Sequence, residues 1–405
     1  MNILFLTIGS IKSVKAHALY PDLIRELASH GHTVHVVSAL EKRYSENTKL
    51  VKTDGIYDLK VKIGNLTKCG IIEKGISTLM ITHKYKAAIK KYFPGVRFDL
   101  VLYSTPPITL AGVVKYIKRR DKARTYLLLK DIFPQNAIDI GLLKKSGIKG
   151  LIYKYFRMKE KTLYRLSDRI GCMSQANVDY VLHHNPEIPS DTVEICPNSI
   201  EVLDVSLSDE DRLSMRQKYG IPSDKTVFVY GGNLGKPQGI PFVIDCLKTC
   251  KIEGAFFLIV GDGTEYGKLN EYIETEKPQN VRLMKALPKD DYDRMIAACD
   301  VGLIFLDRRF TIPNFPSRLL TYMQARLPII AATDVNTDVG KVIVDGGFGW
   351  WCESKNPKDF RTLVEYALSS DLSEMGSMAL KYLMREYSVA DAAKTILQQR
   401  IVAHN

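Results

Sequence analysis

The sequence has no long hydrophobic run. No apolar stretch reaches the roughly 18 residues that a membrane span requires, and the opening run from Ile3 to Leu6 is far too short for a signal sequence. We therefore expect a soluble protein of the cytoplasm. The seven cysteines are an odd number and include no C-x-x-C pair, which argues against a disulfide framework and against a zinc site.

Other absences narrow the chemistry. No Ser-His-Asp or Cys-His pairing suggests nucleophilic hydrolysis, no recognised nucleic-acid module accompanies the positive charge, and no low-complexity tract or short repeat is present. What remains is a chain of 405 residues, of which 45% are hydrophobic. That length exceeds one ordinary core and suits two domains of about 200 residues each.

Positive charge is concentrated in the first half of the chain. Residues 1–200 hold 32 Lys/Arg against 17 Asp/Glu, whereas the remainder holds 25 against 28. Two segments interleave this charge with bulky apolar residues: 70–93 has five lysines and one glutamate, and 141–169 has nine basic and two acidic residues. The combination suits an anionic membrane surface, although a solvated helix face beside core residues has the same composition.

Strand and helix patterns alternate along the chain. Strands at Ile3–Thr7 and Thr33–Ser38 flank a helix at Leu19–His30 that Gly31 ends. Later elements of the first half are strands at 100–104, 125–130, 169–173 and 192–196 and helices near 108–118 and 151–166. The second half repeats the scheme, with strands near 227, 256, 281, 301 and 328 and an amphipathic helix at 388–403. This alternation predicts an α/β protein with parallel sheets covered on both faces and a domain boundary near residue 200.

The most informative segment is VFVYGGNLGKPQGI, residues 227–240. An apolar strand breaks there into a glycine-rich turn that carries Lys236, and a helix is predicted to start near Gly239. Glycines accept positive φ and admit a ligand close to the main chain, and a helix start directs a positive dipole at the same place. The turn predicts a phosphate cradle, although plain strand-to-helix corners also use such turns.

Two further strands of the second half end in polar loops. Residues 255–260 lead into Gly-Asp-Gly, and 301–306 lead into a basic segment before Asn314. Ligands of open parallel sheets bind beyond the carboxyl ends of the strands. We therefore expect one shared pocket for a negatively charged group.

With these motifs the chain resembles the retaining family-4 glycosyltransferases of the GT-B fold, which build bacterial capsule and O-antigen repeat units on a lipid diphosphate. The resemblance covers nearly the whole chain and rests on MNILFLTIGSIKSVKAHALYPDLIRELASHGHTVHVVS, FDLVLYSTPPITLAG, LLLKDIFPQNAIDIGLL, VEICPNSI, VFVYGGNLGKPQGI, FLIVGDGTE and VGLIFLDRRFTIPNFPSRLLTYMQARLPIIAATD. It implies two doubly wound Rossmann-like domains facing a cleft. The two domains are an acceptor-binding domain at 1–200 and a nucleotide-sugar-binding domain at 201–385. A C-terminal helix at 386–405 is expected to pack back on the first domain.

The resemblance also implies partners. The donor is a nucleotide sugar, with a UDP-sugar favoured, and the acceptor is a lipid-diphosphate-linked saccharide. No metal is expected, and the protein would associate peripherally with the inner face of the plasma membrane. A front-face retaining mechanism, in which the leaving phosphate helps to deprotonate the acceptor hydroxyl, follows from the family alone.

Several residues are candidates for the donor site. They are Gly9 from the first domain and Gly231, Gly232, Asn233, Lys236, Gly261, Glu265, Leu287, Asn314, Pro316, Ser317, Arg318, Leu319 and Thr321 from the second. Lys236 and Arg318 are expected to stabilise the negative charge that grows on the leaving diphosphate. Each of these roles has a structural alternative. The alternative for Arg318 is a surface arginine that lies over the helix, for Asn314 and Ser317 it is helix capping, and for Gly261 it is a simple strand-end turn.

The first domain offers two catalytic candidates. Asp131 follows the apolar strand in LLLKDIFP, so we expect it at a strand end as a general base or as an acceptor for a sugar hydroxyl; a capping or turn aspartate is the alternative. His17 would orient the acceptor or serve a structural role. Lys12, Lys15 and Lys130 would meet the lipid diphosphate or remain solvated.

The chain also departs from its family. Many members of the family carry two glutamates eight positions apart near the donor, and the aligned positions in this chain are Pro313 and Thr321. The arginine and lysine that the family usually has in the glycine-rich turn align with Asn233 and Gln238. The ribose would then need another partner, such as Thr321 or Glu265. Two alternative functions are considered. One is a nucleotide-sugar 2-epimerase that hydrolyses its substrate, and the other is a catalytically degenerate sugar-nucleotide-binding protein of a polysaccharide assembly complex.

Overall fold

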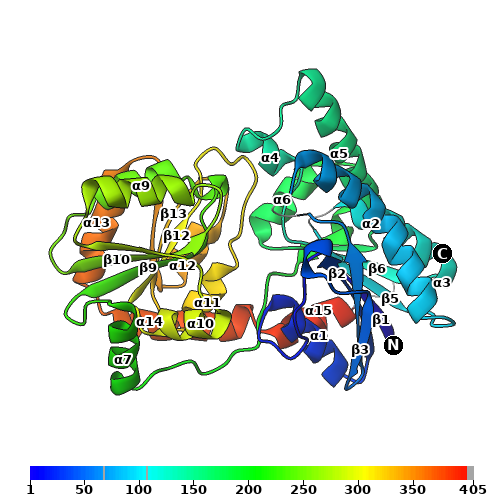
Figure 1. The fold of residues 1–405 in the computed structure, drawn as a ribbon, viewed down its shortest axis with the longest axis horizontal. Coiled ribbons are helices and arrows are strands. Elements are labelled where there is room, and N and C mark those ends of the chain that lie inside the picture. Colours follow the sequence, from blue (N-terminus) through cyan, green and yellow to red (C-terminus); the bar gives the residue numbers. More distant parts are fainter. Residues whose placement is uncertain (67–68, 106–107, 399–405) are drawn as a thin grey trace. The chain divides into compact units, whose positions relative to one another are not determined.

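The computed structural model describes residues 1–66, 69–105 and 108–398, and the chain divides into two compact units (Figure 1). The first unit comprises Met1–Glu201 and the segment that begins at Val389, and the second is Val202–Ser388. Each unit has its own sheet. All seven cysteines are free and six of them are buried, as expected of reduced packing residues. In the described part of the chain, no helix combines the length and the apolar character needed to cross a bilayer.

The first unit is built on an eight-stranded sheet with the order β3-β4-β2-β1-β5-β6-β7-β8. The strands are β1 Asn2–Leu6, β2 Thr33–Glu41, β3 Lys49–Thr53, β4 Ile56–Ile63, β5 Leu100–Ser104, β6 Arg124–Leu129, β7 Arg169–Cys172 and β8 Val193–Ile195. All neighbours pair in parallel except β3, which is antiparallel to β4. The prediction of a purely parallel sheet is wrong at this edge, because Asp54 and Gly55 both adopt positive φ and close a two-residue hairpin.

Helices cover the first sheet on both faces. They are α1 Leu19–Ser29, α2 Ile71–Tyr92, α3 Ala111–Asp121, α4 Gln135–Asp139, α5 Gly147–Leu166, α6 Gln175–His184 and α15 Val389–Leu397. Leu23 of α1 and Ala393 of α15 share one core cluster with Phe5 and Tyr126 of the sheet. The amide of Val389 also donates to the carbonyl of Ile200, at 3.1 Å. The C-terminal helix therefore packs within the first unit.

The second unit is built on a six-stranded parallel sheet with the order β11-β10-β9-β12-β13-β14. Its strands are β9 Thr226–Asn233, β10 Ala255–Asp262, β11 Val281–Met284, β12 Val301–Phe305, β13 Ile329–Thr333 and β14 Gly349–Glu353. Its helices are α7 Asp209–Tyr219, α8 Ile240–Thr249, α9 Tyr266–Glu276, α10 Lys289–Ala297, α11 Arg318–Gln324, α12 Val339–Asp345, α13 Pro357–Leu368 and α14 Leu372–Glu386. Helices α8, α9 and α13 pack on one face of this sheet.

The strand order of the second unit decides where a site lies. Strand β9 runs between β10 and β12, so the three strands predicted to end in ligand-binding loops are neighbours. Their carboxyl ends meet at one edge because all three are parallel. Both units alternate strand and helix around a central sheet, which confirms the predicted class of two doubly wound α/β domains.

A buried histidine makes the first unit sensitive to acid. His35 of β2 stacks on Tyr57 with ring centroids 4.8 Å apart, and burial lowers its pKa to about 4. The unfolded chain binds this proton near pH 6.5, so stability is intact above that pH and falls as the pH drops toward 4, by about 2 kcal/mol after allowance for partial solvation. We expect His35→Phe to weaken this dependence in thermal melts between pH 7 and pH 4; an unchanged dependence would exclude His35 as its source.

Candidate active site

The glycine-rich turn of the second unit is held by its own side chains. Gly232 has φ +130° and Gly239 φ +61°, whereas Gly235 is at φ −120°. The Gln238 Oε1 atom accepts from the amide of Gly235 and from Asn233 Nδ2, both at 3.1 Å. Helix α8 then begins directly after Gly239, as predicted. The residue that replaces the family's lysine, Gln238, therefore fixes the shape of the turn.

The guanidinium of Arg318 lies against this turn. A Cβ placed on Gly232 would sit 3.4 Å from Arg318 Nη2, and Arg318 Cζ lies 4.3 Å from the ring centroid of Tyr230. The Nη1 atom is buried and has no hydrogen-bond partner among the described residues. A side chain from the start of α11 and a glycine at the end of β9 thus meet at the carboxyl edge of the sheet.

Three tyrosines surround the Arg318 guanidinium without neutralising it. The hydroxyl of Tyr230 donates to the carbonyl of Asn233 at 2.7 Å. The hydroxyl of Tyr322 accepts from the amide of Gly231 at 3.1 Å and donates to the carbonyl of Leu303. Burial raises the pKa of Tyr230, Tyr292 and Tyr322. These phenols stay uncharged at neutral pH, so the positive charge of Arg318 remains available to an anion.

Gly261 and Glu265 both make contacts within the second unit that explain their presence in the fold. A Cβ on Gly261 would come within 1.9 Å of the carbonyl oxygen of Gly232 on the paired strand, so only glycine fits. Glu265 is buried, its carboxylate pairs with Lys268 and its amide donates to the carbonyl of Leu234 at 2.9 Å. The fold therefore explains both residues without a ligand contact.

The remaining donor-side candidates flank Arg318 or lie farther along the edge. The carbonyl of Asn314 accepts from Thr337 Oγ1 at 2.5 Å, and Ser317 occupies the N-cap of α11 without a side-chain cap bond. Leu319 is fully buried, with its amide bonded to Pro316. Thr321 and Leu287 are half-buried, and Lys236 is exposed. Of the nearby arginines, Arg309 is paired with Asp307 at 2.6 Å and Arg308 is exposed.

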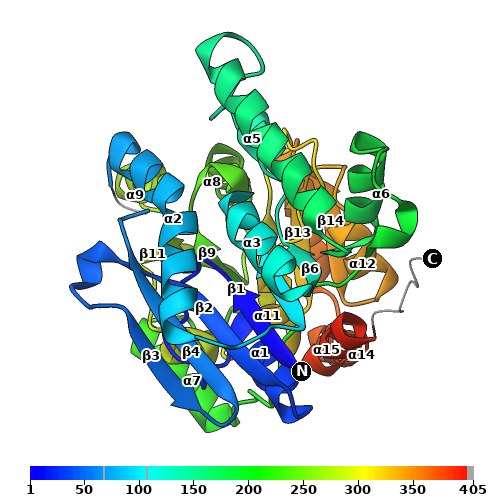
Figure 2. The ribbon, with the colours of Figure 1, turned by 90° about the vertical axis from the view of Figure 1, so that its right-hand side faces the viewer.

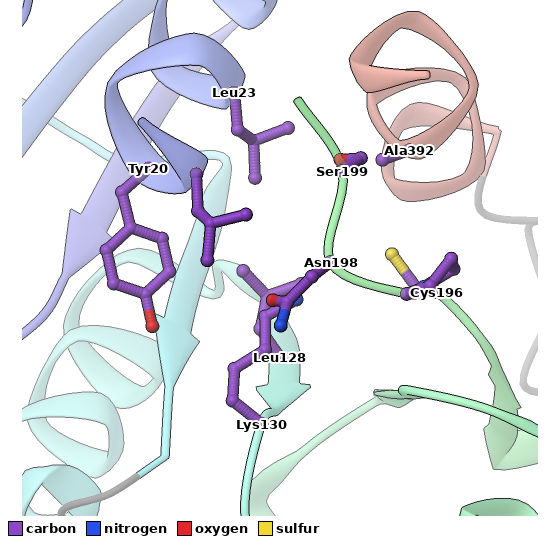
Figure 3. A pocket seen from close by; sticks show the side chains of 10 residues that line it. Tyr20, Leu23, Leu128, Lys130, Cys196, Asn198, Ser199 and Ala392 are labelled. Atoms are coloured by element: carbon purple, nitrogen blue, oxygen red, sulfur yellow. The ribbon is translucent and has the colours of Figure 1, made fainter. Parts of the chain in front are cut away.

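Lys130 and Asp131 directly follow strand β6 in the first unit. Lys130 lines a narrow pocket together with Tyr20 of α1, Asn198 and Cys196 (Figure 3). Burial lowers the pKa of Lys130 to about 8, and the Asn198 Oδ1 atom is buried without a partner among the described residues. The pocket is therefore lined by an amine that is mostly protonated at pH 7 but loses its proton more readily than an exposed lysine, and by the amide oxygen of Asn198.

One of the two carboxylate oxygens of Asp131 has a hydrogen-bond partner among the described residues, and the other has none. Its Oδ2 atom accepts from Asn136 Nδ2 at 2.6 Å, whereas Oδ1 is buried with no hydrogen-bond partner in the described residues. Burial raises the pKa of Asp131 to about 6, against the lowering effect of the bond from Asn136. Such a carboxylate is mostly ionised at pH 7 and basic enough to accept a proton.

His17 belongs to a different cluster. Its Nδ1 atom lies 3.3 Å from Glu201 Oε2, and Arg25 Nη2 pairs with Asp22 at 2.7 Å and with Glu201 at 2.8 Å. His17, Asp22 and Glu201 offer ligand atoms within 4.8 Å of one another. Because Arg25 already pairs with both carboxylates, we interpret the group as an ion-pair cluster and not as a metal site. Gly9 follows β1, with its amide bonded to Thr7 Oγ1 at 3.0 Å.

Two family models match the chain, one for each unit. Residues 21–202 match Glycosyltransferase Family 4, and residues 211–381 match Glycosyl transferases group 1. The chain is a glycosyltransferase.

The glycosyltransferase is similar to several bacterial proteins. It is 25% identical to the probable glycosyltransferase WbjE of Pseudomonas aeruginosa, over 81% of this chain and 80% of that protein. It is 22% identical to WcaI of Escherichia coli (strain K12), named for colanic acid biosynthesis, over 79% of this chain and 80% of WcaI. The crystal structure of HepE from Anabaena in complex with UDP matches with a TM-score of 0.69 and 15% identity, covering 98% and 99% of the two chains. These matches confirm the GT-B fold.

The sequence did not identify the tyrosines around Arg318 in the glycosyltransferase. The sequence feature that could have indicated them is a glycine within each of two buried strands, where a tyrosine packs closely. A Cβ on Gly231 would lie 1.9 Å from the Tyr292 hydroxyl, and a Cβ on Gly302 would lie 2.4 Å from the Tyr322 ring. Glycine inside a strand often marks the close approach of another group. It does not say which group.

Proposed function

We propose that the glycosyltransferase moves a hexose or N-acetyl(deoxy)hexosamine from a nucleotide sugar to a lipid-diphosphate-linked saccharide, with retention, in capsule or O-antigen synthesis. The observation that carries this proposal is the buried Nη1 of Arg318 beside Gly232, which has no hydrogen-bond partner among the residues that the structure describes. A buried charge without a counterion is costly. A donor diphosphate would supply both the negative charge and the missing hydrogen-bond acceptor.

The proposed chemistry follows from the charges at this edge of the second sheet. Negative charge grows on the leaving phosphate as the sugar becomes oxocarbenium-like, and a preorganised cation lowers that barrier. The planar guanidinium of Arg318 suits two phosphate oxygens at once, and Lys236 can approach from the surface. In this proposal the two side chains take the place of a divalent cation, so no metal is needed. Asp131 would serve as the base or hydroxyl acceptor on the acceptor side.

The names of the relatives support the choice of substrates. HepE was solved with UDP, which favours a UDP-sugar, and WcaI is named for colanic acid biosynthesis, which favours an assembly of polysaccharide repeat units. The basic first half of the chain suits an anionic membrane surface. We therefore place the proposed reaction at the inner face of the plasma membrane.

The proposal is tested by supplying both substrates. The full chain is incubated with UDP-, GDP- and dTDP-sugars and a lipid-diphosphate saccharide, in the presence of a chelator, and nucleoside diphosphate and glycolipid are measured. We expect acceptor-dependent release of one nucleoside diphosphate. If none of the donors gives glycolipid, the proposal is wrong.

The absence of an acidic residue at Pro313 and Thr321 favours one other candidate, a sugar-nucleotide-binding protein without activity. It predicts nucleotide binding with no turnover. An epimerase that hydrolyses its substrate predicts release of nucleoside diphosphate without any acceptor. The same assay separates all three.

A further inference from the structure

The first turns of α5 carry an exposed apolar stripe. We call it the α5 stripe: Ile148, Leu151, Ile152, Tyr155 and Met158. These residues recur at spacings of three and four along the helix, which places them on one face. All five are exposed, with Ile148 at 82%, Leu151 at 68% and Met158 at 55%. Single exposed apolar residues are ordinary, but a continuous row of them marks a surface that another phase or molecule covers.

Helix α5 is anchored to its unit mainly by its second half. Glu160, Leu163 and Tyr164 are buried there, and the Tyr164 hydroxyl donates to Glu160 Oε1 at 2.8 Å. In the first half only Gly150 is buried. Figures 1 and 2 both show the N-terminal end of α5 standing clear of the rest of its unit. The α5 stripe thus lies on a projecting helix end.

The charged residues in the segment that contains the α5 stripe are all basic as far as position 159. Residues 141–159 contain six Lys/Arg and no Asp/Glu, and Lys144, Lys145, Lys149 and Lys154 are exposed. The first acidic residue, Glu160, is buried and paired with Arg157. The covering surface must therefore be apolar within and negatively charged at its rim.

Helix α2, the other basic segment, differs from α5. Its first turns expose Ile76, Leu79 and Met80, but Ile81 and Tyr85 are fully buried. Most of its apolar face is therefore core. Among the side chains that the structure describes in these two segments, α5 carries the longer exposed row.

We propose that the α5 stripe inserts into an anionic lipid surface, with the flanking lysines on the headgroups. A bilayer with acidic lipids provides an apolar layer beneath a negative rim, which is the complement of this helix. The proposal rests on the proposed function in one respect, since a lipid-linked acceptor brings the enzyme to a membrane. It adds which element enters the lipid.

Vesicle sedimentation with the full chain tests this proposal. The probe is a set of vesicles of phosphatidylcholine alone or mixed with phosphatidylglycerol, at low and high salt. The triple variant Ile148→Gln, Leu151→Gln, Ile152→Gln removes apolar surface without changing charge, and glutamine keeps good helix propensity. We expect its partition onto anionic vesicles to fall about tenfold. The matched control Leu213→Gln, Val344→Gln changes exposed apolar residues of the second unit and should bind like the wild type.

A second set of variants tests the charge. Lys144→Gln, Lys145→Gln, Lys149→Gln should also weaken binding, and the residual binding should depend less on salt. Leu151→Trp should show blue-shifted emission when vesicles are added. The proposal is overturned if the wild type ignores anionic vesicles or if the triple variant binds as well as the wild type. It is also overturned if the α5 stripe instead mediates self-association or capture of a protein without lipid.

Measuring donor binding and transfer separately from vesicle binding distinguishes a failure of the insertion proposal from a failure of the proposed function. UDP-sugar affinity and transfer to a water-soluble acceptor analogue should be unchanged in the triple variant, because its three positions are exposed and the donor candidates other than Gly9 lie in the second unit. Vesicle binding without transfer would refute the proposed function alone. Transfer without vesicle binding would refute the insertion of the α5 stripe alone.

Discussion

Replacing Arg318 by glutamine is expected to lower kcat by about 10²–10³-fold, the effect of removing one preorganised donor from a developing anion. The reason is the position of the guanidinium, which lies against Gly232 with Nη1 buried and unpartnered in the described part of the chain. Arg318→Lys should restore part of the rate, because it returns the charge but not the planar fork. Steady-state kinetics and calorimetric binding of the nucleoside diphosphate would measure both effects.

Two controls make the Arg318 experiment specific. Arg308→Gln removes an exposed positive charge from the preceding loop and should change the rate only slightly. The second control is stability. Arg318 is a buried cation with no carboxylate partner in the described ranges of the chain, so its loss should leave the melting temperature of the ligand-free protein unchanged or raise it. A variant that folds, binds nucleotide like the wild type and turns over at the wild-type rate would remove Arg318 from the donor site.

The positions of the strands were readable from the sequence because their signals are local. Buried runs such as Leu100–Ser104 are continuous and apolar, and glycines or prolines bound them. Strands β3 and β4 were both missed. The residues of β3 are largely exposed at the sheet edge, so it has neither an apolar run nor a clear alternation, and the apolar residues of β4 are interrupted by Asp58, Lys60 and Lys62. The segment Gly349–Glu353, which contains two tryptophans, was also missed. It forms the edge strand β14, with mostly half-buried side chains.

The candidate site was readable only in part. Parallel strand ends must share an edge, so the meeting of Gly232 with the Arg318 region followed from sequence order and topology. The partners of each side chain did not follow. Whether Lys268 would pair with Glu265, or Arg309 with Asp307, depends on side-chain positions that no spacing encodes. Likewise, the ion-pair cluster of His17 depends on Glu201, which lies far from it in the sequence.

Replacing Asp131 by asparagine is expected to lower kcat by about 10²–10⁴-fold, the usual effect of losing a general base. Burial raises the pKa of Asp131 to about 6. The carboxylate is the active form, so wild-type activity should be full above this pH and should fall as the pH drops below about 6. The pH profile of kcat/KM on the acid side would measure this, and the asparagine variant should lose that limb.

The hydrogen bond from Asn136 to Asp131 Oδ2 gives a test that distinguishes a catalytic aspartate from a purely structural one. The bond from Asn136 Nδ2 lowers the pKa of Asp131, so Asn136→Ala should move the acid limb to higher pH while sparing much of the rate at pH 8. Stability should respond in the opposite sense to activity. A carboxyl group whose folded pKa is raised destabilises the fold above that pKa, so Asp131→Asn should melt at the same or a higher temperature at pH 8. An active asparagine variant with an unchanged pH profile would make Asp131 a turn residue, and the base would then have to be the leaving phosphate alone.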